Sequence, residues 1–379
     1  MKAFELRNLT FADGSQGSLV FRDGRFVSAA DDAEVVDCRG KLVLPPLHNA
    51  HTHTAMTLLR GYGDDMPLQQ WLEKKIWPAE ANLTQQDVFA GAMLGCMEMA
   101  LSGTSYFCDM YWHPAAAVKA AVESGLRAAS TGVVIDMFDS EKAAAQRGEV
   151  EEFVDEWKGV NRRVSLAVGP HAIYTVSEES LVWCARFARD NGLKLHIHIA
   201  ETEKEVQDCR GEFGLTPVQY LDRIGFLGPD VIGAHCVWLT DEDVGILADR
   251  GVTVAHIPVS NMKLAVGEEF SLVRLRDAGV SVTVGTDGCS SNNNLDMFEE
   301  MKFAAMLAKS RTGDPTSASA REDLEIGRTK KYRAARDRKG NVQGREAPPD
   351  LMLLDISHPQ WFPCTMPSPT WFTRPAGRR

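Results

Sequence analysis

The sequence lacks the features that mark a secreted or membrane-spanning chain. It begins without a long apolar segment, and no later run reaches the roughly 18 apolar residues that a membrane helix needs. None of its eight cysteines forms a C-x-x-C pair, and their wide spacing indicates reduced thiols rather than a disulfide framework or a structural zinc cluster. We therefore expect a cytoplasmic protein with no membrane partner.

The sequence also has fewer basic than acidic residues. The formal net charge is -11 at pH 7, and this disfavours nucleic acid as a partner because phosphates are neutralised by clustered Lys and Arg. One basic run, residues 328–339, is interpreted as a solvated helix or loop. The 44% hydrophobic and 25% charged residues are typical of a globular enzyme, so the expected partner is a small molecule. Self-association into a homo-oligomer stays open.

The two ends of the chain are expected to form a small β domain. Residues 1–40 carry short apolar runs separated by Asp-Gly pairs, which is typical of β-hairpins. These hairpins cannot bury their apolar faces alone, and the strand pattern at 350–355 is the expected partner. We predict a β-sandwich and a barrel domain with these boundaries: 1–46 and 336–379 for the sandwich, and 47–335 for the barrel.

The middle of the chain alternates apolar β-rich runs with longer amphipathic segments. Thr84, Ser177 and Thr240 are suitable N-caps for three of the expected helices. The β-rich runs are eight in number: 41–47, 104–111, 129–137, 164–172, 194–202, 231–239, 252–260 and 280–287. Eight such strand and helix units predict a (β/α)8 TIM barrel.

Histidines and acids gather where the predicted strands end, and that end of such a barrel carries the active site. His51 and His53 lie two apart on an extended segment, so both imidazoles point to the same side. Other strand ends supply further candidates: His171, His198, Glu201, His235 and Asp287. Three imidazoles and one carboxylate form a suitable ligand set for zinc, with one position open for water.

Several of these residues have alternative interpretations. His196 would face the same side of its strand as His198, so either could be the ligand, and the nearby Glu201 favours His198. His235 could be a core histidine bonded to backbone, and Asp287 could cap a turn. The remaining histidines are interpreted as packing, supporting or surface residues: His48, His256, His113 and His358.

Five motifs follow one another along the chain: His51-Thr-His53, His198-Ile-Ala-Glu-Thr202, Ala234-His-Cys-Val-Trp238, His256-Ile-Pro-Val-Ser-Asn-Met-Lys-Leu264 and Gly285-Thr-Asp-Gly-Cys-Ser-Ser-Asn-Asn293. In this order they resemble the amidohydrolase superfamily, over about residues 40–316. Within the superfamily the motifs are most similar to methylthioadenosine/S-adenosylhomocysteine deaminases and their chlorohydrolase relatives. The resemblance implies a hydrolase with one divalent metal per chain, zinc before iron or manganese.

The resemblance also implies a role for each matching residue. The metal would be held by His51, His53, His198 and Asp287. The catalytic groups would be Glu201 as proton carrier, His235 beside the hydrolytic water, and the metal-bound Asp287. The substrate would meet Trp71 and Glu80 at its sugar, His171 at the purine and Ser291 along the base pocket.

The implied reaction is hydrolytic deamination of an adenosine-type nucleoside in purine metabolism. Methylthioadenosine, S-adenosylhomocysteine or adenosine would give the inosine counterpart and ammonia. The chemistry needs a strong nucleophile and protonation of both ring nitrogen and leaving amine, and a metal with one mobile-proton carboxylate supplies all three. Two alternatives stay open: a hydrolase of another ring, such as guanine or a triazine, and an inactive ligand-binding barrel.

The chain departs from the family pattern in places. Pro46 and His48 replace a glycine and an aliphatic residue, and the tail shows no resemblance at about 318–349 or after 363. Residues 364–375, back-translated in a frame two bases later, resemble the family's text, so we interpret the tail as incomplete and frame-shifted. Residues 131–134 do not match arginines that some relatives carry, which leaves the group on the substrate's 5′ carbon open.

Overall fold

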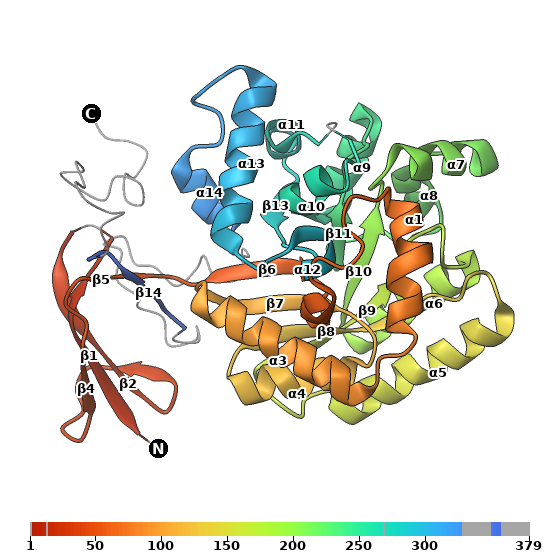
Figure 1. Ribbon diagram of the computed structural model, residues 1–379. Coiled ribbons are helices and arrows are strands. Elements are labelled where there is room, and N and C mark those ends of the chain that lie inside the picture. Colours follow the sequence, from red (N-terminus) through yellow and green to blue (C-terminus); the bar gives the residue numbers. More distant parts are fainter. Residues whose placement is uncertain (1, 13, 268–269, 328–349, 358–379) are drawn as a thin grey trace.

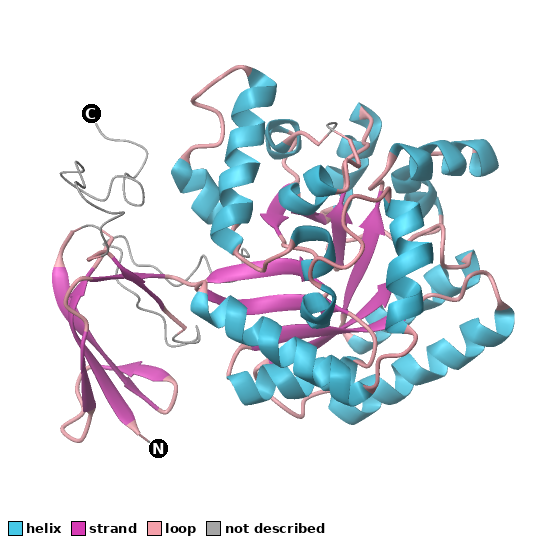
Figure 2. Ribbon diagram, viewed as in Figure 1, coloured by secondary structure: helices cyan, strands magenta, loops and turns pink. Residues whose placement is uncertain are grey.

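Eight parallel strands form the larger body of the computed structural model, which describes residues 2–12, 14–267, 270–327 and 350–357. They follow one another around the sheet in chain order: β6 (Leu47–Thr52), β7 (Thr104–Met110), β8 (Arg127–Val134), β9 (Val164–Pro170), β10 (Lys194–Ile199), β11 (Val231–His235), β12 (Thr253–His256) and β13 (Ser281–Val284). The first and last strands meet where the backbone N–H of Asp287 donates to the carbonyl of His51 at 3.0 Å. The predicted (β/α)8 barrel is therefore confirmed (Figures 1 and 2).

Helices surround these strands (Figure 2). They are α3 (Gln85–Leu101), α4 (Pro114–Ser124), α5 (Ser140–Trp157), α6 (Glu178–Asn191), α7 (Glu203–Phe213), α8 (Pro217–Arg223), α9 (Asp241–Arg250), α10 (Pro258–Lys263), α11 (Leu272–Asp277), α12 (Cys289–Asn292), α13 (Met297–Thr312) and α14 (Ala320–Ile326). The predicted caps Thr84, Ser177 and Thr240 each accept a backbone N–H of the first turn of α3, α6 and α9. None of the helices in the described ranges is long and apolar enough to cross a membrane.

The long connection between β6 and β7 carries short helical segments. They are a 3-10 turn (Thr54–Leu59), α1 (Leu68–Trp71), a π-helical turn (Leu72–Ile76) and α2 (Trp77–Glu80). Trp71, Leu72 and Ile76 are buried in the same apolar cluster as α3 and the start of β8. This packing fixes the connection against the barrel and holds Glu80 at the end of α2.

The alternation of residues in β10 decides which side chains enter the barrel. Leu195, Ile197 and Ile199 are fully buried in the largest apolar cluster, which includes residues of α6 and α7. Successive side chains of a strand point to opposite faces, so His196 and His198 face the barrel interior. The hydrophobic effect that packs helices on the strands thereby also orients the histidines.

The smaller body is a six-stranded sheet made from both ends of the chain. Its strands are β1 (Ala3–Thr10), β2 (Gln16–Arg22), β3 (Arg25–Val27), β4 (Glu34–Asp37), β5 (Lys41–Leu44) and β14 (Met352–Asp355). The order is β14-β5-β1-β2-β3, and the sheet divides at β1, whose start pairs with β4 and whose last residue, Thr10, pairs with Leu42. The expected β domain from both ends is confirmed.

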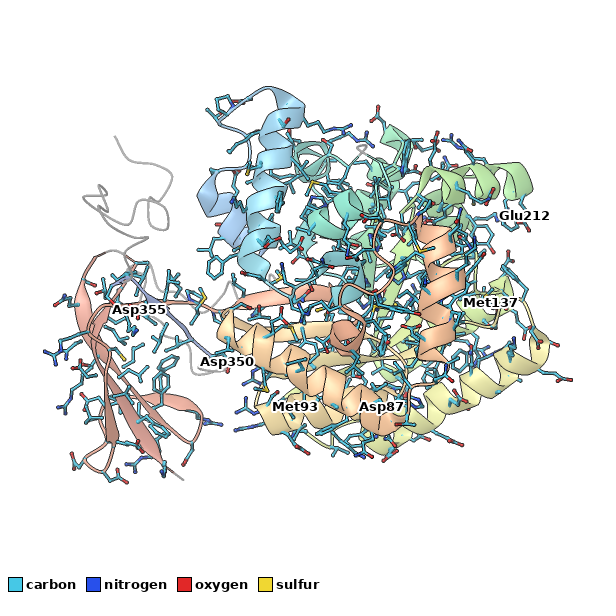
Figure 3. All side chains as sticks on the ribbon, viewed as in Figure 1. Asp87, Met93, Met137, Glu212, Asp350 and Asp355 are labelled. Atoms are coloured by element: carbon cyan, nitrogen blue, oxygen red, sulfur yellow. The ribbon has the colours of Figure 1, made fainter. Side chains whose placement is uncertain are left out.

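Strand β14 links the two bodies (Figure 3). It pairs antiparallel with β5, and Asp355 at its end forms an ion pair with Lys41. Asp350, just before the strand, accepts from Arg127 Nε of barrel strand β8 at 2.6 Å. The segment predicted to complete the small domain is therefore also attached to the barrel.

The structure differs from expectation at the first barrel strand. The apolar run 41–47 is divided between β5 of the small sheet and β6 of the barrel by Pro45 and Pro46. Proline has no backbone N–H to donate to a strand pair, so the run cannot continue as one strand. The basic run 328–339 and the tail interpreted as frame-shifted, 364–375, lie outside the described residues.

We predict that Gly285→Ala destabilises the barrel at its closure. An added Cβ would lie 2.7 Å from the backbone N of His51 and 2.8 Å from its carbonyl oxygen, so β6 and the loop after β13 must separate. The free energy of unfolding, measured with denaturant, should fall by about 2–4 kcal/mol. Gly245→Ala is the control, because nothing lies within 4 Å of its Cβ in α9, and it should be neutral or stabilising by up to about 1 kcal/mol. Equal effects of both substitutions would contradict the prediction.

Candidate metal centre and active site

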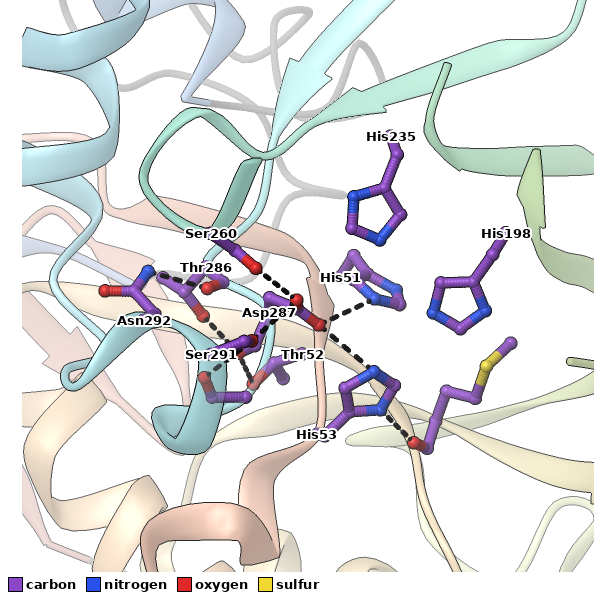
Figure 4. Close-up of polar contacts among 12 residues, drawn as sticks. His51, Thr52, His53, His198, His235, Ser260, Thr286, Asp287, Ser291 and Asn292 are labelled. Carbon is purple, nitrogen blue, oxygen red and sulfur yellow. Dashed lines mark hydrogen bonds and ion pairs between the residues drawn. The ribbon is translucent and has the colours of Figure 1, made fainter. Parts of the chain in front are cut away.

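Five of the predicted residues meet at the carboxyl ends of the barrel strands (Figure 4). One nitrogen each of His51, His53 and His198 lie within 4.8 Å of one another. The same limit holds for a second group, in which His51 is joined by His235 and Asp287. The elements that bring them together are β6, β10, β11 and the loop after β13.

The carboxylate of Asp287 is held from two sides. Its Oδ1 lies 3.3 Å from His51 Nε2 and 3.1 Å from His53 Nε2. Its Oδ2 accepts the hydroxyls of Ser260 and Ser291 at 2.6 and 2.7 Å. Burial raises the pKa of Asp287, but the two neighbouring imidazoles outweigh burial and hold that pKa well below its usual range. The carboxylate is therefore charged and turned toward the imidazoles.

The ring nitrogen Nδ1 of each clustered imidazole has a partner on the barrel. His53 Nδ1 pairs with the carbonyl of Met110, and His198 Nδ1 donates to the carbonyl of His171 at 2.8 Å. His235 Nδ1 lies 2.8 Å from Asn261 Oδ1. These contacts leave the Nε2 atoms of the three rings for the centre of the cluster, as supporting hydrogen bonds do in metal sites.

Contact with His51 distinguishes the two candidate metal ligands on β10, His196 and His198. The Nδ1 of His51 lies 2.9 Å from Nε2 of His196, while its own buried Nε2 faces Asp287 Oδ1 at 3.3 Å. His198 instead offers its nitrogen to the cluster. His196 therefore supports His51, and His198 stands in the position expected of a ligand.

The electrostatics of the cluster suit a cation. Burial lowers the pKa of His51 to about 4 and the pKa of His198 well below its usual value, so both rings are neutral with lone pairs available. Burial acts on His53 in the same direction, but Asp287 outweighs it and raises the pKa of His53 to about 9. The neutral rings of His51 and His198, together with the charged Asp287 carboxylate that draws positive charge onto His53, fit a divalent metal.

Glu201 stands beside this cluster. Its Oε2 lies 3.8 Å from His235 Nε2, and burial raises the pKa of its carboxyl group. The turn that presents it is fixed by Glu205, whose two carboxylate oxygens accept the backbone N–H groups of Ala200 and Glu201 at 2.9 and 2.8 Å. Burial raises the pKa of Glu205 to about 8. The buried Glu201 is suited to accept and release a proton near neutral pH.

A cavity opens next to the cluster, and most predicted substrate residues line it. They are Trp71, Glu80 and His171, together with His53, His198, Glu201, His235 and Asp287. Ser291, expected along the base pocket, is not among the described residues that line this cavity. It lies in the helical turn α12, four residues after Asp287, and its hydroxyl donates to Oδ2 of that carboxylate.

Several residues that contribute to the site were not predicted from the sequence. Ser260 and Asn261 stood in the quoted motif that begins at His256, but nothing in the motif showed that they contact Asp287 and His235. Tyr111, Trp112 and Tyr174 also line the cavity. Their position just after strands β7 and β9 was the available signal.

Three of the remaining histidines make contacts away from the cluster. The ring of His48 contacts Tyr106, and the ring of His256 stacks on Phe270. His113 is exposed, and its Nε2 lies 3.3 Å from the carbonyl of Leu83. His358 lies outside the described residues.

A (β/α)8 barrel whose strand ends gather imidazoles and one carboxylate defines the class of metal-dependent hydrolases. The comparisons are more specific. The sequence model of the Amidohydrolase family matches residues 42–323, and the chain belongs to this family. The resemblance seen in the motifs is thus confirmed.

Curated relatives match most of the chain. A 5′-deoxyadenosine deaminase of Methanosarcina acetivorans is 44% identical over 359 residues, covering 93% of this chain and 82% of the relative. The 5-methylthioadenosine/S-adenosylhomocysteine deaminase 1 of Archaeoglobus fulgidus is 44% identical over 337 residues, covering 87% and 77%.

Solved structures share the fold. An adenosine deaminase from Xanthomonas campestris with bound zinc superposes with a TM-score of 0.83 at 31% identity, covering 96% of this chain and 87% of that one. An atrazine chlorohydrolase from Arthrobacter aurescens complexed with zinc gives 0.74 at 21% identity, covering 86% and 81%, and shows the fold alone.

We predict that His53→Ala removes most of the bound metal. The substitution deletes one nitrogen of the cluster and leaves Asp287 with one imidazole fewer. Elemental analysis of the purified wild type should give about one divalent metal per chain, and the variant should retain under about a tenth of that amount. The exposed His113 provides the control, since His113→Ala should keep the metal; a full complement in His53→Ala would contradict the assignment.

Proposed function

We propose that the protein is a metal-dependent deaminase of adenosine-type nucleosides that releases ammonia. The observation that carries the proposal is one cavity shared by the imidazole cluster, Glu201 and a second carboxylate, Glu80. The names of the deaminase relatives at 44% identity and of the adenosine deaminase structure support the same reaction.

The metal would be held by His51, His53, His198 and Asp287. Zinc is the identity that this imidazole-rich set favours, with iron or manganese as alternatives. When bound, such an ion supplies the Lewis acidity that makes water a nucleophile near neutral pH. Ser260 and Ser291 keep Asp287 turned toward the imidazoles through their hydrogen bonds to Oδ2.

Glu201 moves the protons. Its buried carboxylate takes a proton from the attacking water and delivers it to the ring nitrogen next to the amino-bearing carbon. His235, 3.8 Å from Glu201, orients the water because its Nδ1 is engaged by Asn261 and its Nε2 faces the cavity. The second proton of the water, carried by the same carboxylate, then reaches the amine, the carbon–nitrogen bond breaks, and ammonia leaves while the oxygen stays on the ring carbon.

The rest of the cavity fits a purine nucleoside. His171 would contact the base, and its ring is held by a 2.8 Å contact between Nδ1 and Thr175 Oγ1. Trp71 and Glu80 would meet the sugar, since a carboxylate accepts hydrogen bonds from two vicinal hydroxyls. A free base such as guanine, or a triazine, has no sugar hydroxyls that could bind Glu80. The presence of Glu80 in the cavity therefore favours a nucleoside substrate over these alternatives.

We expect Glu201→Gln to lower kcat by about two orders of magnitude or more while metal content and nucleoside binding persist. The amide keeps the shape of the side chain but cannot carry the proton. Conversion of adenosine to inosine, followed by absorbance, gives the measurement. Glu203→Gln, in an exposed position two residues away, should behave as wild type. A fully active Glu201→Gln would remove the proposed mechanism, and an inactive wild type with metal bound would favour a ligand-binding barrel.

The finer choice of substrate depends on the apolar part of the cavity. Among the described residues that line it, none is Lys or Arg. The apolar lining includes Leu68, Ile76, Val133, Ile135 and Leu264. S-adenosylhomocysteine carries a charged amino acid on its 5′ carbon, and burying that carboxylate without a cation is costly. We therefore propose a neutral 5′ group, as in 5′-deoxyadenosine, 5′-methylthioadenosine or adenosine.

We predict at least about a ten-fold higher kcat/KM for 5′-methylthioadenosine than for S-adenosylhomocysteine, the scale of one unpaired polar group. Val133→Arg, which adds a cation to the lining, should narrow this ratio, whereas Val133→Leu should not. Equal kcat/KM values for both substrates with the wild type would show that the cavity does not select by charge.

A further inference from the structure

Trp112 makes a polar contact that the proposed mechanism does not use. Its indole Nε1 donates to Glu80 Oε2 at 3.1 Å. The two residues come from different parts of the barrel rim, Glu80 from the end of α2 and Trp112 from the segment that follows β7. Both line the cavity, so the hydrogen bond lies within the space where a substrate would bind.

The backbone around this pair is fixed on both sides. On one side, Leu83 N donates to the carbonyl of Glu80 at 2.9 Å, and the ring of His113 lies 3.3 Å from the carbonyl of Leu83. On the other side, Trp112 is followed by His113 in the left-handed region, with φ 51°, at the N-cap of α4. The Glu80 and Trp112 segments are therefore joined by more than the indole contact.

The same strand end serves the imidazole cluster. Met110, the last residue of β7, offers its carbonyl to His53, and Trp112 follows two residues later. One short segment thus contacts a candidate metal ligand and Glu80. This segment therefore fixes the position of Glu80 relative to the imidazole cluster.

The carboxylate of Glu80 has few ways to turn. Burial raises its pKa, while Trp112 and the neighbouring Tyr111 lower it. The buried Tyr111 is therefore a second neighbour that limits rotation of this carboxylate. With the Trp112 indole on Oε2, the carboxylate keeps acceptor positions for an incoming group.

We propose that Trp112 is a positioning residue for recognition of the sugar, holding Glu80 so that its carboxylate accepts the vicinal 2′- and 3′-hydroxyls of the nucleoside. The inference rests on the proposed function, because it takes the substrate to be a nucleoside. It assigns selection of ribonucleosides over their dideoxy counterparts to a pair of residues rather than to Glu80 alone. Loss of the indole N–H lets the carboxylate rotate and weakens hydroxyl recognition without touching the reacting atoms.

The experiment compares Trp112→Phe with wild type in the full-length, metal-loaded protein. Phenylalanine keeps an aromatic ring against the apolar cluster around β7 but lacks the N–H. For adenosine, KM should rise about ten-fold and kcat should change less than about two-fold. For 2′,3′-dideoxyadenosine, which has no diol, both constants should equal those of wild type. Trp183→Phe, on α6 and stacked on Phe187, controls for loss of an indole elsewhere.

A double-mutant cycle separates positioning from packing. In a Glu80→Ala background the Trp112→Phe substitution should have no further effect on KM, because the group that it positions is gone. A KM increase that is equal for adenosine and the dideoxy nucleoside, or that persists in Glu80→Ala, would overturn the inference.

Binding of inosine and 2′,3′-dideoxyinosine, measured by calorimetry, tests the inference independently of turnover. Trp112→Phe should weaken binding of inosine alone. If wild type deaminates adenosine while Trp112→Phe equals it in every measurement, the inference alone fails. If wild type neither turns over nor binds these nucleosides, the proposed function fails and the inference with it.

Discussion

The burial of one charged carboxylate among imidazoles is the interaction on which the site depends. Asp287 takes part in it twice, because its backbone N–H donates to His51 as the barrel closes and its side chain faces His51 and His53. A buried carboxylate is costly unless it is paired and hydrogen-bonded, and the hydroxyls of Ser260 and Ser291 complete that pairing. The same residue therefore closes the barrel through its backbone and compensates charge in the site through its side chain.

The remaining polar contacts extend this arrangement outward. A carbonyl at the end of β7, another directly after β9 and the side-chain amide of Asn261 each engage one ring nitrogen of an imidazole. Glu205 fixes the turn that carries Glu201 in the same way. The scaffold thus determines which atoms face the cavity, and this pre-organisation is what chemistry at a buried site requires.

Much of the fold could be predicted from local patterns. Apolar runs located the strands, and the Thr84, Ser177 and Thr240 caps located helix starts because capping is chemistry within a few residues. The site histidines were predictable because strand ends of a barrel converge.

What local patterns could not decide depends on tertiary contacts. His196 and His198 share one face of β10, and only contact with His51 separates them. The break at Pro45 and Pro46 assigns one apolar run to two bodies, which periodicity does not show. The hydrogen bond from Trp112 to Glu80 joins positions 32 apart, and no short-range signal predicts it.

The pairing of β14 with β5 has a consequence for how the protein is made. Lys41 and Asp355, which close this pairing, are 314 positions apart, so roughly 15 to 60 s of translation at about 5–20 residues per second separate their appearance. Throughout that interval β5 presents an open backbone edge to neighbouring nascent chains on the same message. The strand pairing that completes the smaller sheet thus forms only near the end of synthesis, well after the barrel strands that carry the site have been made.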